Sequence, residues 1–140
     1  METKCVYPAI FYKAIEGGYY VIFPDLGCVT QGEDIKETFF MAENCLGTWL
    51  YDFFLKNKDL PTSSNIKDVV IDEKEKEFSI LEDSFVSLVG IDLGEYAKKC
   101  SKKVIRKNVA IPSYLNEMAK NMNINVSKVL KDALEKEFNL

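Results

Sequence analysis

Residues 104–138 carry one strand pattern and two helix patterns in a stretch too short to fold by itself. In "VIRKNVAI" (104–111), odd and even positions face opposite sides, as they do in a strand. A single strand leaves its backbone groups unpaired, and fewer than about 40 residues bury too little surface for a stable core. Two copies solve both problems, because their strands can pair into an antiparallel ribbon while their four helices close a shared core. The pattern therefore predicts a dimer formed through this segment.

The two helix patterns follow this strand directly. Ser113 is expected to cap the first helix, and Asn123 to end it in a left-handed conformation. Asn125 or Ser127 is expected to begin the second helix. The two apolar stripes are Leu115, Met118, Ala119 and Met122, then Val126, Val129, Leu130, Ala133 and Leu134, extending toward Phe138.

The predicted ribbon has the shape of a DNA reader. A two-stranded ribbon fits the major groove of DNA, and its outer face would present Arg106 and Asn108 from each chain. The N-terminus of the second helix offers free N–H groups to a phosphate. We therefore expect double-stranded DNA as a partner, bound by a homodimer or by a larger even-numbered oligomer.

Charge is divided unevenly along the chain. Residues 1–97 hold 8 basic and 18 acidic side chains, a net of -10, whereas residues 98–140 hold 10 basic and 4 acidic, a net of +6, which together give the net charge of -4. A basic end of this kind is typical of a module that binds a polyanion, although a solvated basic face gives the same count. With "KKCSKK" (98–103) as a linker, the expected domains are 1–97 and 104–140.

Residues 1–97 predict an α+β domain, in which one main helix packs on a small antiparallel sheet. Strands are expected at 6–14, 19–23, 28–31, 66–71 and 84–93, with Pro8 indicating an edge or a bulge. Gly17 and Gly18 mark a hairpin, because glycine accepts the positive φ of tight turns. Asp34 is expected to cap a helix over 35–55.

This helix pattern has two apolar stripes. The main stripe is expected to lie across the sheet, and the weaker one is either further core or a surface for a partner. The stripes are Ile35, Phe39, Ala42, Leu46, Trp49 and Phe53, then Phe40, Gly47, Tyr51 and Phe54.

The residue content excludes several kinds of chemistry. The chain has no histidine, so it offers no imidazole base and no Ser–His or Cys–His nucleophile. Its four cysteines form no CxxC pair, and Cys28 and Cys45 are expected to be buried thiols. The remaining possibility is Mg²⁺ bound by carboxylates at strand ends, although surface acids are more often simply solvated. The candidates are Asp25, Glu33, Asp34, Asp72 and Asp92, whose spacing matches no metal-ligand signature.

We expect no cofactor, no metal and no enzymatic activity. Without a long apolar run or a secretory signal at the start, the chain is expected to be cytoplasmic and free of any membrane.

Residues 103–138 resemble a ribbon-helix-helix DNA-binding domain. The matching features are the alternating strand ending in Ile111-Pro112, the helix that follows, and "NINVSKVLKDAL" at the start of the second helix. The resemblance implies that Arg106, Asn108 and Ala110 face the groove, although a polar residue usually stands where Ala110 does. It implies a phosphate anchor at Asn125, Val126 and Ser127. Lys103 and Lys128 complete the predicted DNA-binding set.

The first part resembles the N-terminal domain of HicB-type antitoxins. The features that carry this resemblance are the Tyr-Pro start, the Gly-Gly hairpin, "FPDLGC", "TQG", the acidic start of the helix and "SLVGIDLGEYAKK". The resemblance implies a degraded RNase H-like fold without catalysis, and a partner that is a HicA-type toxin, a small basic mRNA endoribonuclease. The net charge of the first part suits such a partner. The predicted toxin-binding residues are Asp25, Phe40, Tyr51 and Phe54.

The resulting hypothesis is a type II antitoxin that neutralises its toxin by direct binding and represses its own operon as a transcription regulator. Two alternatives stay open. One is a ligand-responsive ribbon-helix-helix repressor whose first domain senses a small molecule and has no toxin partner. The other is residual Mg²⁺-dependent nuclease activity in the acidic domain, which would need Asp25 or Asp92.

Overall fold

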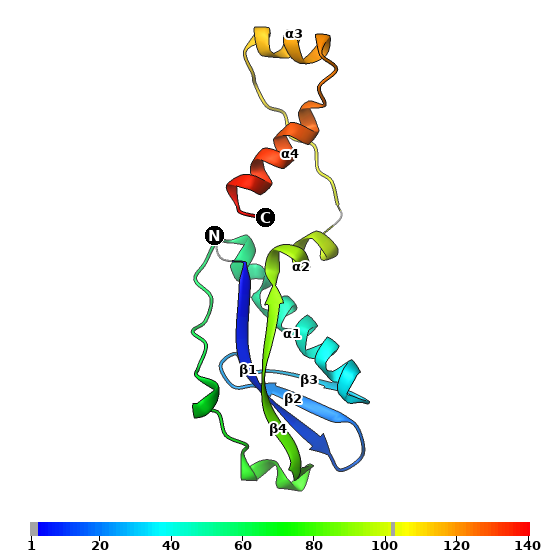
Figure 1. The fold of residues 1–140 in the computed structure, drawn as a ribbon, viewed down its shortest axis with the longest axis vertical. Helices are drawn as coiled ribbons and strands as arrows, with labels where there is room; N and C mark the ends of the chain where they lie inside the picture. The colour runs from blue at the N-terminus through cyan, green and yellow to red at the C-terminus, as the bar shows by residue number, and fades with distance from the viewer. Residues whose placement is uncertain (1–2, 102) are drawn as a thin grey trace.

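A computed structural model describes residues 3–101 and 103–140, and it places an antiparallel sheet and one long helix in the first two thirds of the chain (Figure 1). The strands are β1 (Lys4–Ala14), β2 (Tyr19–Phe23), β3 (Cys28–Gly32) and β4 (Ser79–Asp92), in the order β3-β2-β1-β4. Helix α1 (Ile35–Leu55) lies across one face. The predicted α+β class with one main helix is confirmed.

The hairpin between β1 and β2 forms where the two glycines predict it. Gly17 and Gly18 have φ angles of 111° and 74°, and the amide of Ala14 donates to the carbonyl of Gly18 at 3.0 Å. Pairing of β1 with β2 begins at Ile10, so Pro8 lies where β1 is paired with β4 alone. Of the two expectations for Pro8, the local edge is therefore correct, and the bulge falls later, between Phe11 and Lys13.

Helix α1 begins and ends as expected, but the face that it buries coincides only in part with the predicted main stripe. The Asp34 carboxylate accepts a hydrogen bond from the Glu37 amide at 2.7 Å, which caps the helix start. The predicted main stripe is wrong at Ile35 and Trp49, which are 40% and 47% exposed, whereas its two middle residues are buried as predicted. The residues that α1 buries are Thr38, Ala42, Leu46, Gly47, Leu50 and Phe54.

The segment between α1 and β4 covers the sheet without joining it. The strand predicted at 66–71 is wrong: a short 3-10 turn, η1 (Ile66–Asp68), occupies its start, and Val70 is 74% exposed. A second turn, η2 (Glu73–Glu77), follows. Two tyrosines of β1 hold the segment, since Tyr7 donates to the Pro61 carbonyl at 2.6 Å and Tyr12 accepts from the Asp72 amide at 3.1 Å. Hydrogen bonds to side chains thus replace the backbone ladder that a strand would need.

Strand β4 starts at Ser79, five residues before the predicted 84–93, and leads directly into helix α2 (Leu93–Cys100). The Asp92 carboxylate caps α2 by accepting from the Gly94 amide at 2.9 Å. The predicted linker 98–103 is therefore wrong at its start, because residues 98–100 complete a helix. Ser101 and Lys103 lie outside any element, and Lys102 is outside the described residues.

Two helices, α3 (Ser113–Asn121) and α4 (Val126–Glu137), stand beyond the end of the sheet at which α2 lies (Figure 1). The hydrophobic core is confined to the sheet domain, where α1 packs on Tyr7, Ala9, Phe11, Val21 and Phe23. Of the helices that the structure describes, none is long and apolar enough to cross a membrane.

Candidate functional site

The C-terminal unit of residues 103–140 is open in the single chain. Every residue from 113 to 140 is exposed except Ala119 and Glu135, which are half-buried. Residues 103–112, as the structure describes them, belong to neither helix nor strand, and Val104 and Ile105 are 90% and 75% exposed. Apolar side chains at helical spacing therefore face solvent along both α3 and α4, as the sequence predicts for a unit that lacks its second copy.

The turn between α3 and α4 is tightly built despite this exposure. Asn123 has a φ of 55°, and the Ile124 amide donates to the Ala119 carbonyl at 2.9 Å, which closes α3 in a left-handed cap. The Asn125 side chain accepts from the Lys128 amide at 3.2 Å and caps α4. Both asparagine predictions are confirmed.

The prediction that Ser113 caps α3 is wrong. The cap position falls on Pro112, which has no side-chain acceptor, and Ser113 is the first helical residue. Proline fixes φ near the value that a helix needs, so Pro112 orients the chain into α3 without a cap bond.

The predicted DNA-binding residues occupy two exposed segments. Lys103, Arg106, Asn108 and Ala110 lie in the extended stretch that leads to α3, and all four are exposed. Asn125, Val126, Ser127 and Lys128 form the cap and first turn of α4 and are exposed too. The first group falls within residues 103–110 and the second is the continuous run 125–128, and α3 with its closing turn lies between them.

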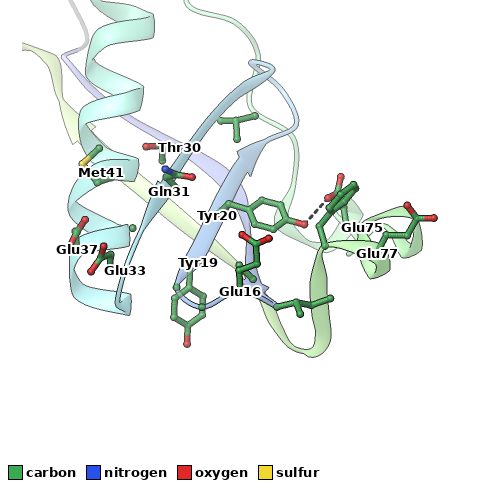
Figure 2. Close-up of a pocket in the computed structure, with 17 residues that line it drawn as sticks. Glu16, Tyr19, Tyr20, Thr30, Gln31, Glu33, Glu37, Met41, Glu75 and Glu77 are labelled. Atoms are coloured by element: carbon green, nitrogen blue, oxygen red, sulfur yellow. Dashed lines mark hydrogen bonds between the residues drawn. The ribbon is translucent and has the colours of Figure 1, made fainter.

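A second candidate site is a groove of about 1160 Å³ at the far end of the sheet domain. Figure 2 shows Glu33 and Glu37 on the α1 side and Glu75 and Glu77 opposite them, with Glu16 between. Apolar side chains share the lining, because Ile15, Phe78 and Val29 are 57%, 65% and 60% exposed. The groove is acidic and partly apolar, which is the chemistry that complements a basic protein surface.

Tyr20 lines this acidic groove and is held in place by its contacts with Glu75 and Tyr12. Tyr20 donates a 2.6 Å hydrogen bond to the Glu75 carboxylate, drawn as the dashed line in Figure 2, and stacks on Tyr12 with ring centroids 5.0 Å apart. Burial, and then the bond to Glu75, raises the pKa of Tyr20 to about 12. Tyr20 therefore stays protonated at neutral pH and fixes the Glu75 carboxylate at the groove wall.

Gly18 allows the hairpin turn to approach β3 at this groove. A Cβ on Gly18 would lie 2.6 Å from the Gly32 carbonyl oxygen, and the φ of 74° also disfavours any other residue. The mouth of the groove is thus held in shape by backbone packing.

This groove was not predicted from the sequence. Residues 72–78 are a run of mostly charged side chains, and only the fold brings Glu75 and Glu77 opposite Glu33 and Glu37. The excess of acidic side chains in residues 1–97 was the one signal for it.

The four predicted toxin-binding residues do not share one surface. Asp25 accepts hydrogen bonds from the Ser64 amide, at 2.8 Å, and from the Ser64 hydroxyl. Phe54 is buried in the core, and Tyr51 packs edge-on against Tyr96 with ring centroids 5.5 Å apart. Phe40 alone of the four is largely open, at 61% exposed.

The carboxylates considered as metal ligands have structural partners. Asp34, Asp72 and Asp92 cap α1, η2 and α2 respectively. Among residues 3–101 and 103–140, no three histidine, cysteine or acidic side chains gather where they could hold a metal ion.

A four-stranded antiparallel sheet backed by one helix, followed by an open helical unit, is an arrangement that this chain shares with solved structures. It matches the crystal structure of the antitoxin HicB from Burkholderia pseudomallei with a TM-score of 0.51, at 20% identity, over 93% of this chain and 96% of that one. A structure of a toxin–antitoxin complex from Streptococcus pneumoniae gives a TM-score of 0.62 and 30% identity, over 96% of this chain and 99% of that one.

The family follows from the sequence as well. The family described as the HicB-like antitoxin of bacterial toxin–antitoxin systems matches residues 7–136, so this chain belongs to the HicB-like antitoxin family. The family is one of antitoxins and not of enzymes. Among curated proteins, no relative matches this sequence.

Proposed function

We propose that this chain neutralises a HicA-type toxin, a small basic mRNA endoribonuclease, by binding it through residues 1–97, and represses its own operon through residues 104–140. The first domain acts as a non-catalytic, degraded RNase H-like scaffold. The second acts as a ribbon-helix-helix dimer on operator DNA, in the cytoplasm. The observation that carries the proposal is the division of one antitoxin chain into an acidic folded domain and a basic unit with exposed apolar stripes.

The acidic groove is the surface that best supports toxin binding. Five glutamates line it beside exposed apolar side chains, and charge of one sign in a concave surface accelerates association with a partner of the opposite sign. The similarity to a toxin–antitoxin complex at 30% identity over nearly the whole chain supports a protein partner. The exposed Phe40 of α1 lies outside the groove lining and is a second contact point in this proposal.

Two features of the C-terminal unit support DNA binding. Pairing two copies would bury the stripes of α3 and α4 and give the stretch around Arg106 and Asn108 the strand partner that it lacks in one chain. In the first turn of α4, the Lys128 amide is already bonded to Asn125, so Val126 and Ser127 supply the amides for a phosphate.

The test is a cleavage assay with the purified full chain and the small basic protein encoded next to its gene. An equimolar amount of the chain should abolish RNA cleavage, and the chain should shift a DNA fragment from its own promoter. RNA cleavage that continues at a molar excess of the chain would contradict the proposal that the chain neutralises this toxin. A promoter fragment bound no better than random DNA would remove the operator half.

The groove can be tested separately by reversing its charge. The double substitution Glu16→Lys with Glu77→Lys changes two exposed groove residues that cap no helix, and we expect it to weaken toxin binding at least tenfold while promoter binding stays unchanged. The control is Glu82→Lys with Asp83→Lys, which makes the same charge change on exposed residues of β4 outside the groove. Equal losses in the two double variants would show that total charge matters and the groove does not.

A further inference from the structure

Cys28 and Cys45 meet where β3 packs on α1. Cys28 is the first residue of β3 and is 8% exposed, while Cys45 lies in the third turn of α1 and is half-buried. Both line one cavity of about 280 Å³, together with Met41 and Trp49. Two free thiols that are far apart in sequence therefore share one opening to solvent.

The two thiols differ in character because they touch each other. The hydrogen bond from Cys28 lowers the pKa of the Cys45 thiol, outweighing the effect of burial. The same contact, and then burial, raises the pKa of Cys28. Cys45 is thus the more readily ionised thiol of the pair, and Cys28 is the neighbour that stabilises its thiolate.

We infer that Cys28 and Cys45 form a peroxide-reactive dithiol, with Cys45 as the nucleophile and Cys28 as the resolving thiol. Small hydroperoxides are the class of oxidant that a cavity of this size admits. Neither the proposed toxin binding nor the proposed DNA binding uses these two side chains directly, so this inference does not rest on the proposed function.

The chemistry balances in two steps. The Cys45 thiolate attacks one oxygen of hydrogen peroxide, so that an S–O bond forms, the O–O bond breaks, and the sulfur is oxidised to a sulfenic acid while the peroxide leaves as hydroxide. Cys28 sulfur then attacks the Cys45 sulfur, an S–S bond forms, and the S–O bond breaks. The departing hydroxide takes the Cys28 proton, and the hydroxide from the first step takes the proton that Cys45 released on ionising, so the net change is two thiols and one peroxide to one disulfide and two waters.

The surroundings of the other two cysteines, Cys5 and Cys100, do not favour this reaction. Burial, with a further contribution from Asp92, raises the pKa of Cys5 to about 11, and its thiol lies 3.7 Å from the Ile91 carbonyl. Cys100 is exposed at the end of α2 and is open to reaction between chains. They serve as internal controls.

The position of the pair gives oxidation a structural consequence. A disulfide would tie the first residue of β3 to α1, and Thr30 and Met41 line both this cavity and the acidic groove. Oxidation would therefore make the segment between this cavity and the acidic groove more rigid. Trp49, the single tryptophan of the chain, reports on the event, because a disulfide beside an indole quenches its fluorescence.

The experiment uses the full chain carrying Cys100→Ser, treated with hydrogen peroxide and mapped by mass spectrometry without reduction. We expect a single Cys28–Cys45 disulfide and a fall in Trp49 fluorescence that a reductant reverses. With Cys28→Ser added, dimedone should label Cys45; with Cys45→Ser added, Cys28 should stay unlabelled. Iodoacetamide at pH 7 should alkylate Cys45 about tenfold faster than Cys5.

Several results would overturn the inference. They are a peroxide-treated chain in which both thiols stay free, a disulfide that involves Cys5, or dimedone labelling of Cys28 in the Cys45→Ser background. Circular dichroism of each variant establishes that it is folded, and Cys5→Ser, the matched control, should leave the Cys28–Cys45 disulfide intact.

Discussion

The ring of Tyr96 in α2 lies directly on the backbone of Gly47 in α1, so close that a Cβ at position 47 would overlap it. The Tyr96 hydroxyl is 3.1 Å from the Thr48 hydroxyl, and its ring meets Tyr51 edge-on. These contacts hold α2 against the long helix. Because α2 is the last element before the open C-terminal unit, they fix the point from which that unit leaves the sheet domain.

Gly47→Ala should destabilise the sheet domain by about 1–3 kcal/mol, because the added methyl group displaces the Tyr96 ring. In a Tyr96→Ala background the sign should reverse, since alanine favours a helix over glycine by about 1 kcal/mol once the space is open. Urea denaturation of the four proteins measures this. Additive effects in the two backgrounds would contradict the contact.

Leu130→Asp should convert the proposed dimer to a monomer and abolish DNA binding, because a charge placed in the proposed shared core would have no partner. Light scattering coupled to gel filtration gives the mass. Asn121→Asp adds the same charge in α3 outside its apolar stripe and should leave the dimer intact. A Leu130→Asp protein that still elutes as a dimer would place the dimer contact elsewhere.

Arg106→Ala should lower operator affinity by about 1–3 kcal/mol and weaken discrimination against random DNA, as expected of a base contact. Lys128→Ala should instead weaken binding to all DNA alike and reduce the salt dependence by about one phosphate. Titrations at several salt concentrations separate the two effects. Equal losses on operator and random DNA for Arg106→Ala would make that residue a phosphate contact.

The Tyr20 hydroxyl should lose its proton at a higher pH in the folded protein than in an unfolded chain. Its pKa in the fold is about 12, above the roughly 10 of an unfolded chain, so its contribution to stability is complete below pH 10 and is lost as the pH rises through 12. Tyrosinate absorbance should show a step near pH 12 that Tyr20→Phe reduces. Tyr114→Phe, which removes an exposed tyrosine of α3, should leave that step unchanged.

Local signals predicted local structure well. The Gly17-Gly18 hairpin, the Asp34 cap and the left-handed Asn123 each depend on the chemistry of one or two residues, and each is present. Long-range effects decided the rest. The run 66–71 has strand composition, but tyrosine hydroxyls and short turns hold this region as a cover over the sheet.

The candidate sites show the same difference between features set by local sequence and features set by the fold. The open stripes of α3 and α4 follow from helical periodicity, so they could be predicted from sequence alone. The acidic groove and the Cys28–Cys45 pair join residues from separate elements, and helical spacing could not reveal that α1 turns Trp49 outward and Leu50 inward.

The open C-terminal unit also ties the lifetime of the protein to its abundance. In the proposed dimer, the fraction of paired chains would rise with concentration, so a newly made chain would expose Val104, Ile105 and their neighbours until it met a second copy. Extended, exposed backbone is what proteases cut first. A low concentration of the protein would thus increase its rate of degradation, and a high concentration would protect it from proteases.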